Sequence, residues 1–540
     1  MQAYATGLLH DEAYYWMYSQ NPDWGYFDHP PAIAILIWLG TSFFSGDFGV
    51  RFFIIICNII TLWFLWKLCS EKIKQPKLFI ILTLSLIYVH AGGFIATPDV
   101  PLLLFTVLFF FYYKDYLAAY DIKNACILAF IIAAGLYSKY HFAAIIFLTI
   151  LSNLNLVTKR SFWLIVILTA ILYLPHILWQ VDHNYPSVKY HISERFGSVY
   201  KISQTTDYIF SQILLAGAFS GIILFYSAIR YKTKSTFEKT LKYNFAGIFL
   251  VFLLATLKGR TEANWTAAGI IPLIILSYYY LADNSKLVRL FLISAIPAVI
   301  ILFFCRFYII FGHPVYDISL LKQVYDWDIW AKQVQEAASG KSVIFVDSYQ
   351  KASKYTWFTG EASYSLNNVY YHRSQYEYWD IEKTFQGKDA IIIMNFPANE
   401  FQKINTKIGE ENYYIIPDFH SYDKVHIKPE FKKYNANEGD TIQTKITISN
   451  NGYAVNFKPS SQTSVMLNLV LQKKGKIFYN NVIGSLDTDD LGRGETYVQE
   501  IKLPIEVEKG FYEMIISLKI GNLGAGLQGD YVLNKCQLKN

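Results

Sequence analysis

Long apolar runs separated by short polar loops fill most of the chain up to Phe311. Each run is close to the roughly 20 residues that an α-helix needs to cross a bilayer. We expect spans at about 48–69, 78–96, 100–117, 124–138, 141–157, 161–180, 208–229, 243–257, 264–282 and 287–311. A shorter apolar run, Ala32 to Phe44, is too brief to span and is expected to be re-entrant or interfacial. The pattern predicts a polytopic α-helical membrane protein, with residues 1–312 as its membrane domain.

The composition becomes charged and mixed beyond His313. The segments SVIFVDS and DAIIIMNF have the pattern of short buried strands, which predicts an α/β domain over 313–423. From Lys424 onward, alternating segments such as TIQTKITISNNG and FYEMIISLKIGN, with turn signals between them, predict an immunoglobulin-like β-sandwich over 424–540. Such a module either recognises an acceptor or serves as a stabilising spacer.

Basic residues are concentrated in alternate loops between the spans. They are Lys72, Lys74 and Lys77, then Lys159 and Arg160, then Arg230, Lys232, Lys234, Lys239 and Lys242, then Lys286 and Arg289. Counting crossings puts all four groups on one side, which the positive-inside rule makes cytoplasmic. This topology explains the net charge of +6 better than a nucleic-acid partner does. The opening stretch, the other loops and both C-terminal domains are then extracytoplasmic, on a protein of the plasma (inner) membrane.

Carboxylates gather in these extracytoplasmic loops. Asp11 and Glu12 open a short aromatic-rich segment, Asp28 and His29 precede Pro30-Pro31, and Asp99 begins an inward-crossing run. Acids in a first helical turn are also ordinary caps or solvated loop residues, and Asp99 is well placed as an N-cap. Their occurrence on one predicted face favours a shared site.

Cations occur in the same loops, against the usual topological bias. They are Lys139 and His141, Lys189 and Arg195 of a long loop, and Lys258 and Arg260. A lipid-linked phosphate needs cationic or N–H donors to be held and to leave. We interpret the group as phosphate-binding; the alternative is ordinary surface charge.

Several other functions lack their sequence signals. No glycine-rich phosphate loop, paired CxxC or HExxH pattern occurs, which disfavours nucleotide hydrolysis and structural zinc. Four cysteines lie in apolar runs and only Cys536 lies beyond them, so a disulfide framework cannot form there. No cofactor is required; a divalent metal held by Asp11, Asp99 or a histidine is possible chemistry but is not compelled.

Six motifs in order resemble a known family. They are DEAYYW, GYFDHPP, TPDVPL, GLYSKYH, LPHILWQVDHNYPSVKYHISER and GRTEANW. Together they resemble the bacterial branch of the protein O-mannosyltransferase-like glycosyltransferases of family 39, relatives of the aminoarabinose transferases that modify lipid A. The resemblance implies the GT-C fold, a polyprenyl-phosphate sugar as donor, and reaction on the extracytoplasmic face.

The resemblance also implies roles for particular residues. Asp11 matches the first acid of the family's essential pair and would be the catalytic base, with Glu12 positioning the acceptor or the base. Asp28 and His29 match the positions before the family's Pro-Pro. Lys139 matches the lysine that approaches the donor phosphate, although this chain reads Lys-Tyr-His where relatives often read Lys-Gly-Pro. The family places a transmembrane helix before its acidic pair, so we expect one upstream of Met1.

The expected reaction is sugar transfer to an extracytoplasmic acceptor, which could be lipid A, a glycan or a protein hydroxyl. One base and a set of cations suffice for a single inverting displacement, without the second carboxylate of a hydrolase. Two other classes compete with this reading. A secondary transporter would carry its polar residues at mid-span rather than in loops. A membrane-anchored sensor binding a ligand through the sandwich would leave the outer charged loops without a role.

Overall fold

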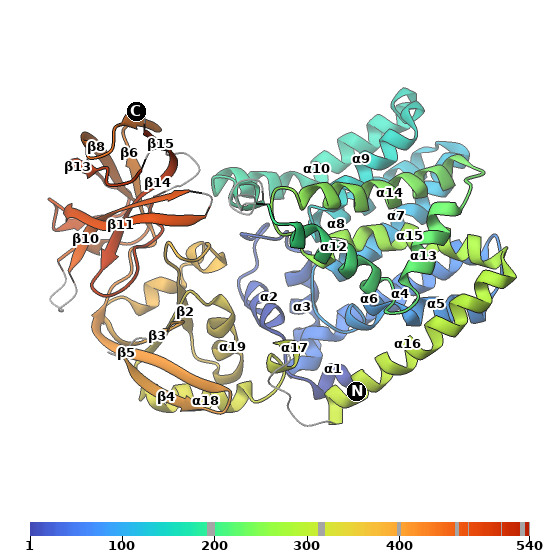
Figure 1. Cartoon of the computed structure of the whole chain (residues 1–540), viewed down its shortest axis with the longest axis horizontal. Helices are drawn as coiled ribbons and strands as arrows, with labels where there is room; N and C mark the ends of the chain where they lie inside the picture. Colours follow the sequence, from blue (N-terminus) through green and yellow to red (C-terminus); the bar gives the residue numbers. More distant parts are fainter. Residues whose placement is uncertain are drawn as a thin grey trace. The chain divides into compact units, whose positions relative to one another are not determined.

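The computed structural model describes residues 1–191, 200–311, 319–396, 401–458, 464–473, 475–508, 510–529 and 535–538. The chain forms two compact units. One comprises Met1–Ser187 and Val199–Tyr325, and the other comprises Val188–Ser198 and Asp326–Asn540. The first is almost entirely helical and the second contains the strands (Figure 1).

The helical unit is that of a multi-pass membrane protein. Five of its described helices are long and apolar enough to cross a membrane: α4 (Gly46–Ser70), α7 (Asp99–Ala119), α10 (Arg160–Asp182), the stretch Ala263–Ala282 that contains α15 (Ala267–Ala282), and α16 (Ser285–Phe311). Shorter apolar helices are α3 (Ala32–Phe43), α5 (Pro76–Ser85), α8 (Ile122–Ser138), α9 (Phe142–Ser152) and α13 (Gly221–Arg230). Helix α3 is the short apolar run that was predicted not to span.

Two predicted spans are broken helices. The run 78–96 contains α5 and a five-residue helix, α6 (Ile87–Ala91), because Leu86 between them is extended. The run 208–229 contains the end of α12 (Ile202–Leu215) and α13, separated by a turn in which Gly217 has a φ of 133°. Hydropathy alone does not show such breaks, since both halves of each run are apolar.

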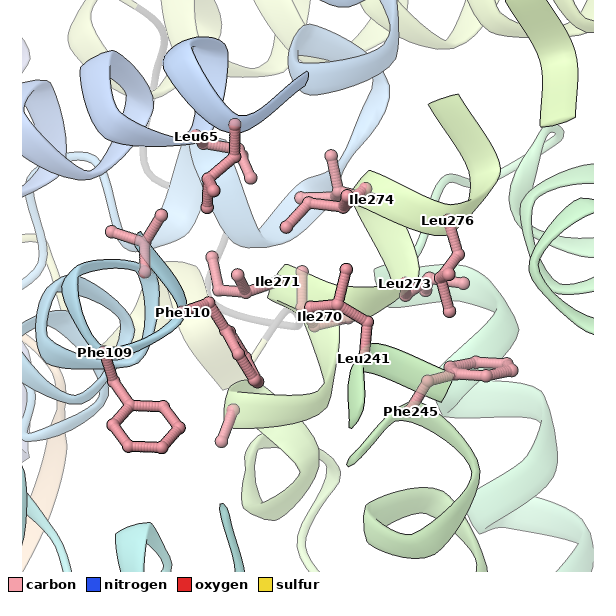
Figure 2. Close-up of a cluster of buried hydrophobic side chains, with 14 of the residues drawn as sticks. Leu65, Phe109, Phe110, Leu241, Phe245, Ile270, Ile271, Leu273, Ile274 and Leu276 are labelled. Carbon is pink, nitrogen blue, oxygen red and sulfur yellow. The ribbon is translucent and has the colours of Figure 1, made fainter. Parts of the chain in front are cut away.

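Helix α15 forms the centre of the helical unit. It contacts α4, α5, α7, α13, α14 (Thr236–Ala255) and α16, and 89% of its apolar window is buried inside the protein. Its own side chains Ile270, Ile271, Leu273, Ile274 and Leu276 belong to a buried apolar cluster (Figure 2). Other helices contribute Leu65 from α4, Phe109 and Phe110 from α7, and Leu241 and Phe245 from α14. A helix that is apolar all round is typical of a position buried among other helices.

The loops of the helical unit gather in two groups. In the group with the basic residues, Lys72 Nζ donates to Glu238 Oε1 over 2.8 Å, and the Gln75 N–H donates to the Tyr278 hydroxyl over 2.9 Å. In the other group, loops around Glu12, Asp99, Lys139 and Asn264 are joined by hydrogen bonds. Which loops lie on which side of the membrane stays a prediction.

The second unit begins its regular structure with an α/β sheet. Helix α18 (Trp327–Ala338) precedes β1 (Ser342–Val346), and α19 (Tyr349–Thr359) connects β1 to β2 (Ser363–Leu366). The strand order is β2-β1-β3-β5-β4, with β3 at Lys388–Met394, β4 at Gln402–Thr406 and β5 at Gly409–Phe419. Strand β1 pairs in parallel with both β2 and β3, whereas β5 is antiparallel to β3 and β4.

The rest of the second unit is a β-sandwich, as the alternating pattern predicts. One sheet has the order β11-β10-β14-β15-β7 and the other β13-β8-β6. Their bounds are β6 Val425–Pro429, β7 Lys433–Ala436, β8 Thr441–Asn450, β10 Val465–Lys473, β11 Lys476–Ser485, β13 Thr496–Pro504, β14 Phe511–Ile520 and β15 Lys535–Leu538. Both architectures fall within one compact unit by contacts, so domain boundaries at 312 and 423 stay predictions.

Candidate active site

The acidic pair of the opening stretch lies in the first turn of α2 (His10–Gln20), and its two members have opposite environments. The Asp11 side chain is exposed, whereas Glu12 is completely buried. Glu12 Oε2 accepts the main-chain N–H of Leu9 over 2.9 Å, so Glu12 caps its own helix. Adjacent residues on a helix point about 100° apart, which allows one carboxylate to face solvent while its neighbour enters the interior.

A buried arginine holds Glu12 in place. Arg51 of α4 donates through Nε to Glu12 Oε1 over 2.8 Å and through Nη2 to Oε2 over 2.5 Å. The same guanidinium bonds the carbonyls of Thr6 (2.6 Å) and Gly7 (3.0 Å), and the Ala96 N–H completes the set by donating to Glu12 Oε1 over 2.8 Å. This paired, hydrogen-bonded arrangement satisfies both buried charges. These bonds hold the first turn of α2, which carries Asp11, against α4 and the loop before α7.

Sequence reasoning missed Arg51, although a signal was available. It lies near the start of the predicted span 48–69, and fifteen uncharged residues separate it from the next charged residue, Lys67. Ionisable residues within such segments face the protein interior and mark functional sites by default.

Asp99 and Lys139, both predicted as substrate-binding, form a second buried ion pair. Lys139 lies between α8 and α9, and its Nζ donates to Asp99 Oδ1 over 2.7 Å. Asn264 of the GRTEANW motif donates through Nδ2 to Asp99 Oδ2, also over 2.7 Å. Both charged side chains are less than 10% exposed. Three motifs far apart in sequence therefore converge on one carboxylate.

Three of the predicted acids influence the same tyrosine, Tyr15. The ring of Tyr15 on α2 is buried. Burial, and then the negative charges of Asp11, Asp28 and Asp99, raise the pKa of the Tyr15 hydroxyl well above its ordinary value. The acids of the DEAYYW, FDHPP and TPD motifs therefore all contribute to the electrostatic surroundings of one hydroxyl.

Asp28 and His29 are held by the aromatic residues of the opening stretch. The Tyr18 hydroxyl donates to Asp28 Oδ1, and His29 Nε2 lies 4.0 Å from Asp28 Oδ2. The rings of Tyr15 and His29 are 5.6 Å apart, and Tyr26 stacks on Tyr18 at 4.1 Å. The dense aromatic content of this stretch therefore builds a rigid wall beside the acids.

The C-terminal part of α10 contacts the loop that follows α2, around Asp23 to Gly25. His176 Nδ1 is 2.7 Å from the Trp24 carbonyl oxygen, and the Trp179 indole donates to Asp23 Oδ2 over 2.8 Å. Gly25 lies flat against the Trp179 ring, where an added Cβ would come within 2.4 Å of it. These contacts explain the LPHILWQ motif, whose His176 and Trp179 were not predicted as site residues.

The remaining predicted cations are more scattered. The His141 ring packs between Phe252 (5.1 Å) and Trp265 (5.7 Å). Lys258 and Arg260 are exposed, and Arg260 Nε lies 3.5 Å from a Glu262 carboxylate oxygen.

The last two predicted cations belong to the long loop. Lys189 ends α11 (Pro186–Lys189) and clusters with the second compact unit, and Arg195 lies outside the described residues. Among the residues that the structure describes, no group of three or more His, Cys, Asp or Glu side chains could hold a metal ion.

An apolar cleft of about 270 Å³ opens between α7, α8, α9 and α10. Tyr113 and Tyr116 of α7 and Tyr173 of α10 are among the residues that line it. Tyr173 belongs to α10, the same helix whose His176 and Trp179 contact the opening loop, and its ring is 5.0 Å from the ring of His176. The described side chains of the cleft are almost entirely apolar, which suits a hydrocarbon chain.

Comparisons with known proteins agree with the sequence motifs. Residues 28–179 match the family described as dolichyl-phosphate-mannose-protein mannosyltransferase. The fold is similar to that of ArnT from Cupriavidus metallidurans in the apo state, with a TM-score of 0.53, 12% identity, and 76% of this chain and 94% of that chain covered. The same protein bound to undecaprenyl phosphate gives a TM-score of 0.51 at 11% identity, covering 76% and 95%. No curated protein sequence matches.

Proposed function

Because this chain has the GT-C fold and is related to the family 39 glycosyltransferases, we propose that it transfers a sugar from a polyprenyl phosphate to an extracytoplasmic acceptor. The acceptor is lipid A, a glycan or a protein hydroxyl. The observation that carries the proposal is the link between the acidic pair and the loop before Asp99: the Ala96 N–H donates to Glu12 Oε1. The exposed Asp11 beside Glu12 and the buried Lys139–Asp99–Asn264 group therefore belong to one cluster of loops.

Asp11 is the proposed base. Its side chain is exposed at the start of α2, whereas Glu12 beside it is fully engaged by Arg51. In the reaction, the Asp11 carboxylate takes the proton of the acceptor hydroxyl, and the hydroxyl oxygen attacks the anomeric carbon. The bond from that carbon to the phosphate oxygen breaks, and the electron pair leaves with the polyprenyl phosphate. A single displacement of this kind inverts the anomeric configuration.

Lys139 is the proposed contact to the leaving phosphate. Its ammonium group is kept in place by Asp99, whose other oxygen is held by Asn264. A charge that is positioned before the reaction stabilises a developing anion without reorganisation. The pairing with Asp99 makes Lys139 a fixed donor rather than a mobile surface lysine.

Two features support a lipid-linked donor. The apolar cleft along α7 to α10 can accept part of a prenyl chain. ArnT, with the same fold, has been solved with undecaprenyl phosphate bound. Neither feature selects a sugar.

The proposed orientation puts the Asp11 loops outside the plasma membrane. It follows from the gathering of basic residues in the opposite loop group, around Lys72 and Gln75. Fusion of a reporter that is active only outside the cytoplasm, placed after residue 540, tests this orientation directly. Activity of a cytoplasm-specific reporter at that position would reverse it.

Release of polyprenyl phosphate tests the reaction. Purified full-length protein would be incubated with a panel of undecaprenyl-phosphate sugars and an envelope extract as acceptor source. Release that requires both the sugar-loaded lipid and the acceptor supports transfer, and the productive donor identifies the sugar. Absence of release, when a known transferase is active in the same assay, would favour a transporter or a sensor.

A further inference from the structure

The α/β sheet of the second unit changes its direction of winding at β1. The chain passes from β1 through α19 to β2 on one side, and then returns to pair β3 with the other side of β1. Both of these pairings are parallel. In open α/β sheets, ligands bind beyond the carboxyl ends of the strands where the winding reverses. A ligand site is therefore expected at the carboxyl ends of β1 and β3.

A carboxylate lies at that place. Asp347 directly follows β1, and its side chain accepts the main-chain N–H of Asn368, beyond β2, over 2.9 Å. The Asp347 carbonyl oxygen is 3.5 Å from the side-chain amide of Asn395, which follows β3. Asp347 is only 8% exposed, whereas Asn395 is exposed. Residues that follow β2 and β3 thus contact Asp347, which follows β1: Asn368 contacts its carboxylate and Asn395 its main-chain carbonyl.

Aromatic residues follow both Asp347 and Asn395 closely in the chain. Tyr349 follows Asp347 after one residue, and its ring is 6.1 Å from that of His372. Tyr371 stacks on His372 at 4.3 Å, and Tyr190 lies 5.9 Å from the same ring. Phe396, which follows Asn395, is 44% exposed. The half-buried Tyr349 and the exposed Phe396, close in the chain to a carboxylate and an amide, combine flat apolar faces with hydrogen-bond acceptors and donors.

The chemistry of this place excludes a phosphate ligand. The turn after β1 reads Val346-Asp347-Ser348-Tyr349, without the glycines that let a backbone approach a phosphate. The Ser348 hydroxyl already accepts the Lys351 N–H at the start of α19. The nearby Arg373 donates to two carbonyls of the sandwich, those of Leu527 and Gly529. The Asp347 carboxylate would moreover repel an anion.

We propose that the carboxyl ends of β1 and β3 form a saccharide-binding site, in which Asp347 and Asn395 bond sugar hydroxyls and the rings of Tyr349 and Phe396 pack against a sugar face. A neutral sugar presents both hydroxyl donors and an apolar C–H face, which matches this set of side chains. The inference rests on the second unit alone and does not depend on the proposed transfer reaction. If both hold, the site recognises a glycan part of the acceptor.

Binding of neutral disaccharides to the full-length protein in nanodiscs tests the site. The probes are mannobiose, lactose and chitobiose at millimolar concentrations, followed by saturation-transfer-difference NMR. We expect at least one to bind. Asp347→Asn keeps the shape of the side chain and should weaken binding about tenfold, the effect of losing one charged hydrogen bond. Tyr349→Ala should weaken binding by a similar factor through loss of a packing face.

Phe511→Ala is the matched control, because Phe511 is an aromatic residue of the same unit, on β14, and is 63% exposed. It should bind like the wild type. All variants would be compared by thermal melting, and Asn395→Ala, at an exposed position, provides a second test should Asp347→Asn unfold. No binding by any probe, or equal binding by wild type and site variants, overturns the proposal. Because no donor lipid is present, this result is separate from the outcome of the transfer assay.

Discussion

Lys139 donates a hydrogen bond to Asp99 over 2.7 Å, and both side chains are buried in the helical unit. The pair joins the loop between α8 and α9 to the first residue of α7. Taken separately in the sequence, Lys139 resembles an ordinary lysine at a helix end and Asp99 resembles an ordinary N-cap. Their contact gives two testable roles, one in stability and one in the reaction.

A double variant separates these two roles. Lys139→Met leaves Asp99 buried without its cation and should destabilise the protein by about 3–5 kcal/mol. Adding Asp99→Asn removes the unpaired charge and should restore most of the melting temperature. It should not restore release of polyprenyl phosphate, because the phosphate contact is still missing. Recovery of both stability and release in the double variant would show that Lys139 only neutralises Asp99.

The Glu12–Arg51 pair should be far more important for stability than Asp11. Glu12→Gln leaves the Arg51 guanidinium buried without a counter-charge, and we expect a loss of about 3–5 kcal/mol. Asp11→Asn changes an exposed side chain and should alter stability by only about 0.5 kcal/mol. Thermal melting of both variants in nanodiscs checks the contrast. Similar melting temperatures would contradict the structural role assigned to Glu12.

Gly25 should not tolerate a side chain. A Cβ at this position would lie 2.4 Å from the Trp179 ring, so Gly25→Ala should push the opening loop away from α10 at a cost of about 1–3 kcal/mol. Sugar transfer should fall, since the loop carries Asp23 and precedes Asp28. Combining the change with Trp179→Phe makes room and should recover part of the lost stability. Unchanged melting of Gly25→Ala would refute the tight packing.

The second unit should lose stability as pH rises through neutrality. Burial raises the pKa of Glu377 to about 7 and holds the pKa values of Glu382 and Asp423 well above their ordinary range. The hydroxyls of Tyr364 and Tyr453 donate to Asp423 and Glu382 respectively. In the unfolded chain these carboxyls have pKa values of about 4, so the native state binds more protons between about pH 4 and pH 7. Its stability is therefore greatest below that window and falls across it.

Protease resistance of this unit at increasing temperature, followed at pH 5 and pH 8, measures the effect. Lys424 packs nearby, with its Nζ donating to the carbonyls of Glu377 (2.9 Å) and Trp379 (2.8 Å), and it only partly offsets the carboxylates. We expect a lower unfolding temperature at pH 8, and a smaller difference in Asp423→Asn. A higher unfolding temperature at pH 8 would reverse the assigned direction.

Sequence patterns predicted the membrane helices and the sandwich well, because long continuous apolar runs mark helices that can cross a membrane and alternating patterns mark strands with one buried face. They did not reveal the helix breaks at Leu86 and Gly217, since those depend on neighbouring helices rather than on local polarity. The site was predicted as a set of loops on one face, and contacts join several of them. The partners inside that set were not predictable, because pairing of Glu12 with Arg51 depends on how α2 packs against α4.

The predicted cations could not be ranked by their local sequence. Lys139 and Lys258 both occur at polar breaks beside apolar runs. Only packing makes the first a buried partner of Asp99 and leaves the second exposed. Burial of a long charged side chain is decided by tertiary contacts, since its apolar stem suits either environment.

Comparison of Asp11→Asn with Asp207→Asn tests the central claim most directly. Both are exposed acids of the same predicted face, but only Asp11 belongs to the acidic pair. Release of undecaprenyl phosphate from the productive sugar donor would be measured for each at equal amounts of folded protein. The account predicts wild-type release by Asp207→Asn and a loss of about a hundredfold or more in Asp11→Asn, as expected on removing a general base. Equal release by the two variants would contradict the assignment of Asp11 as the base.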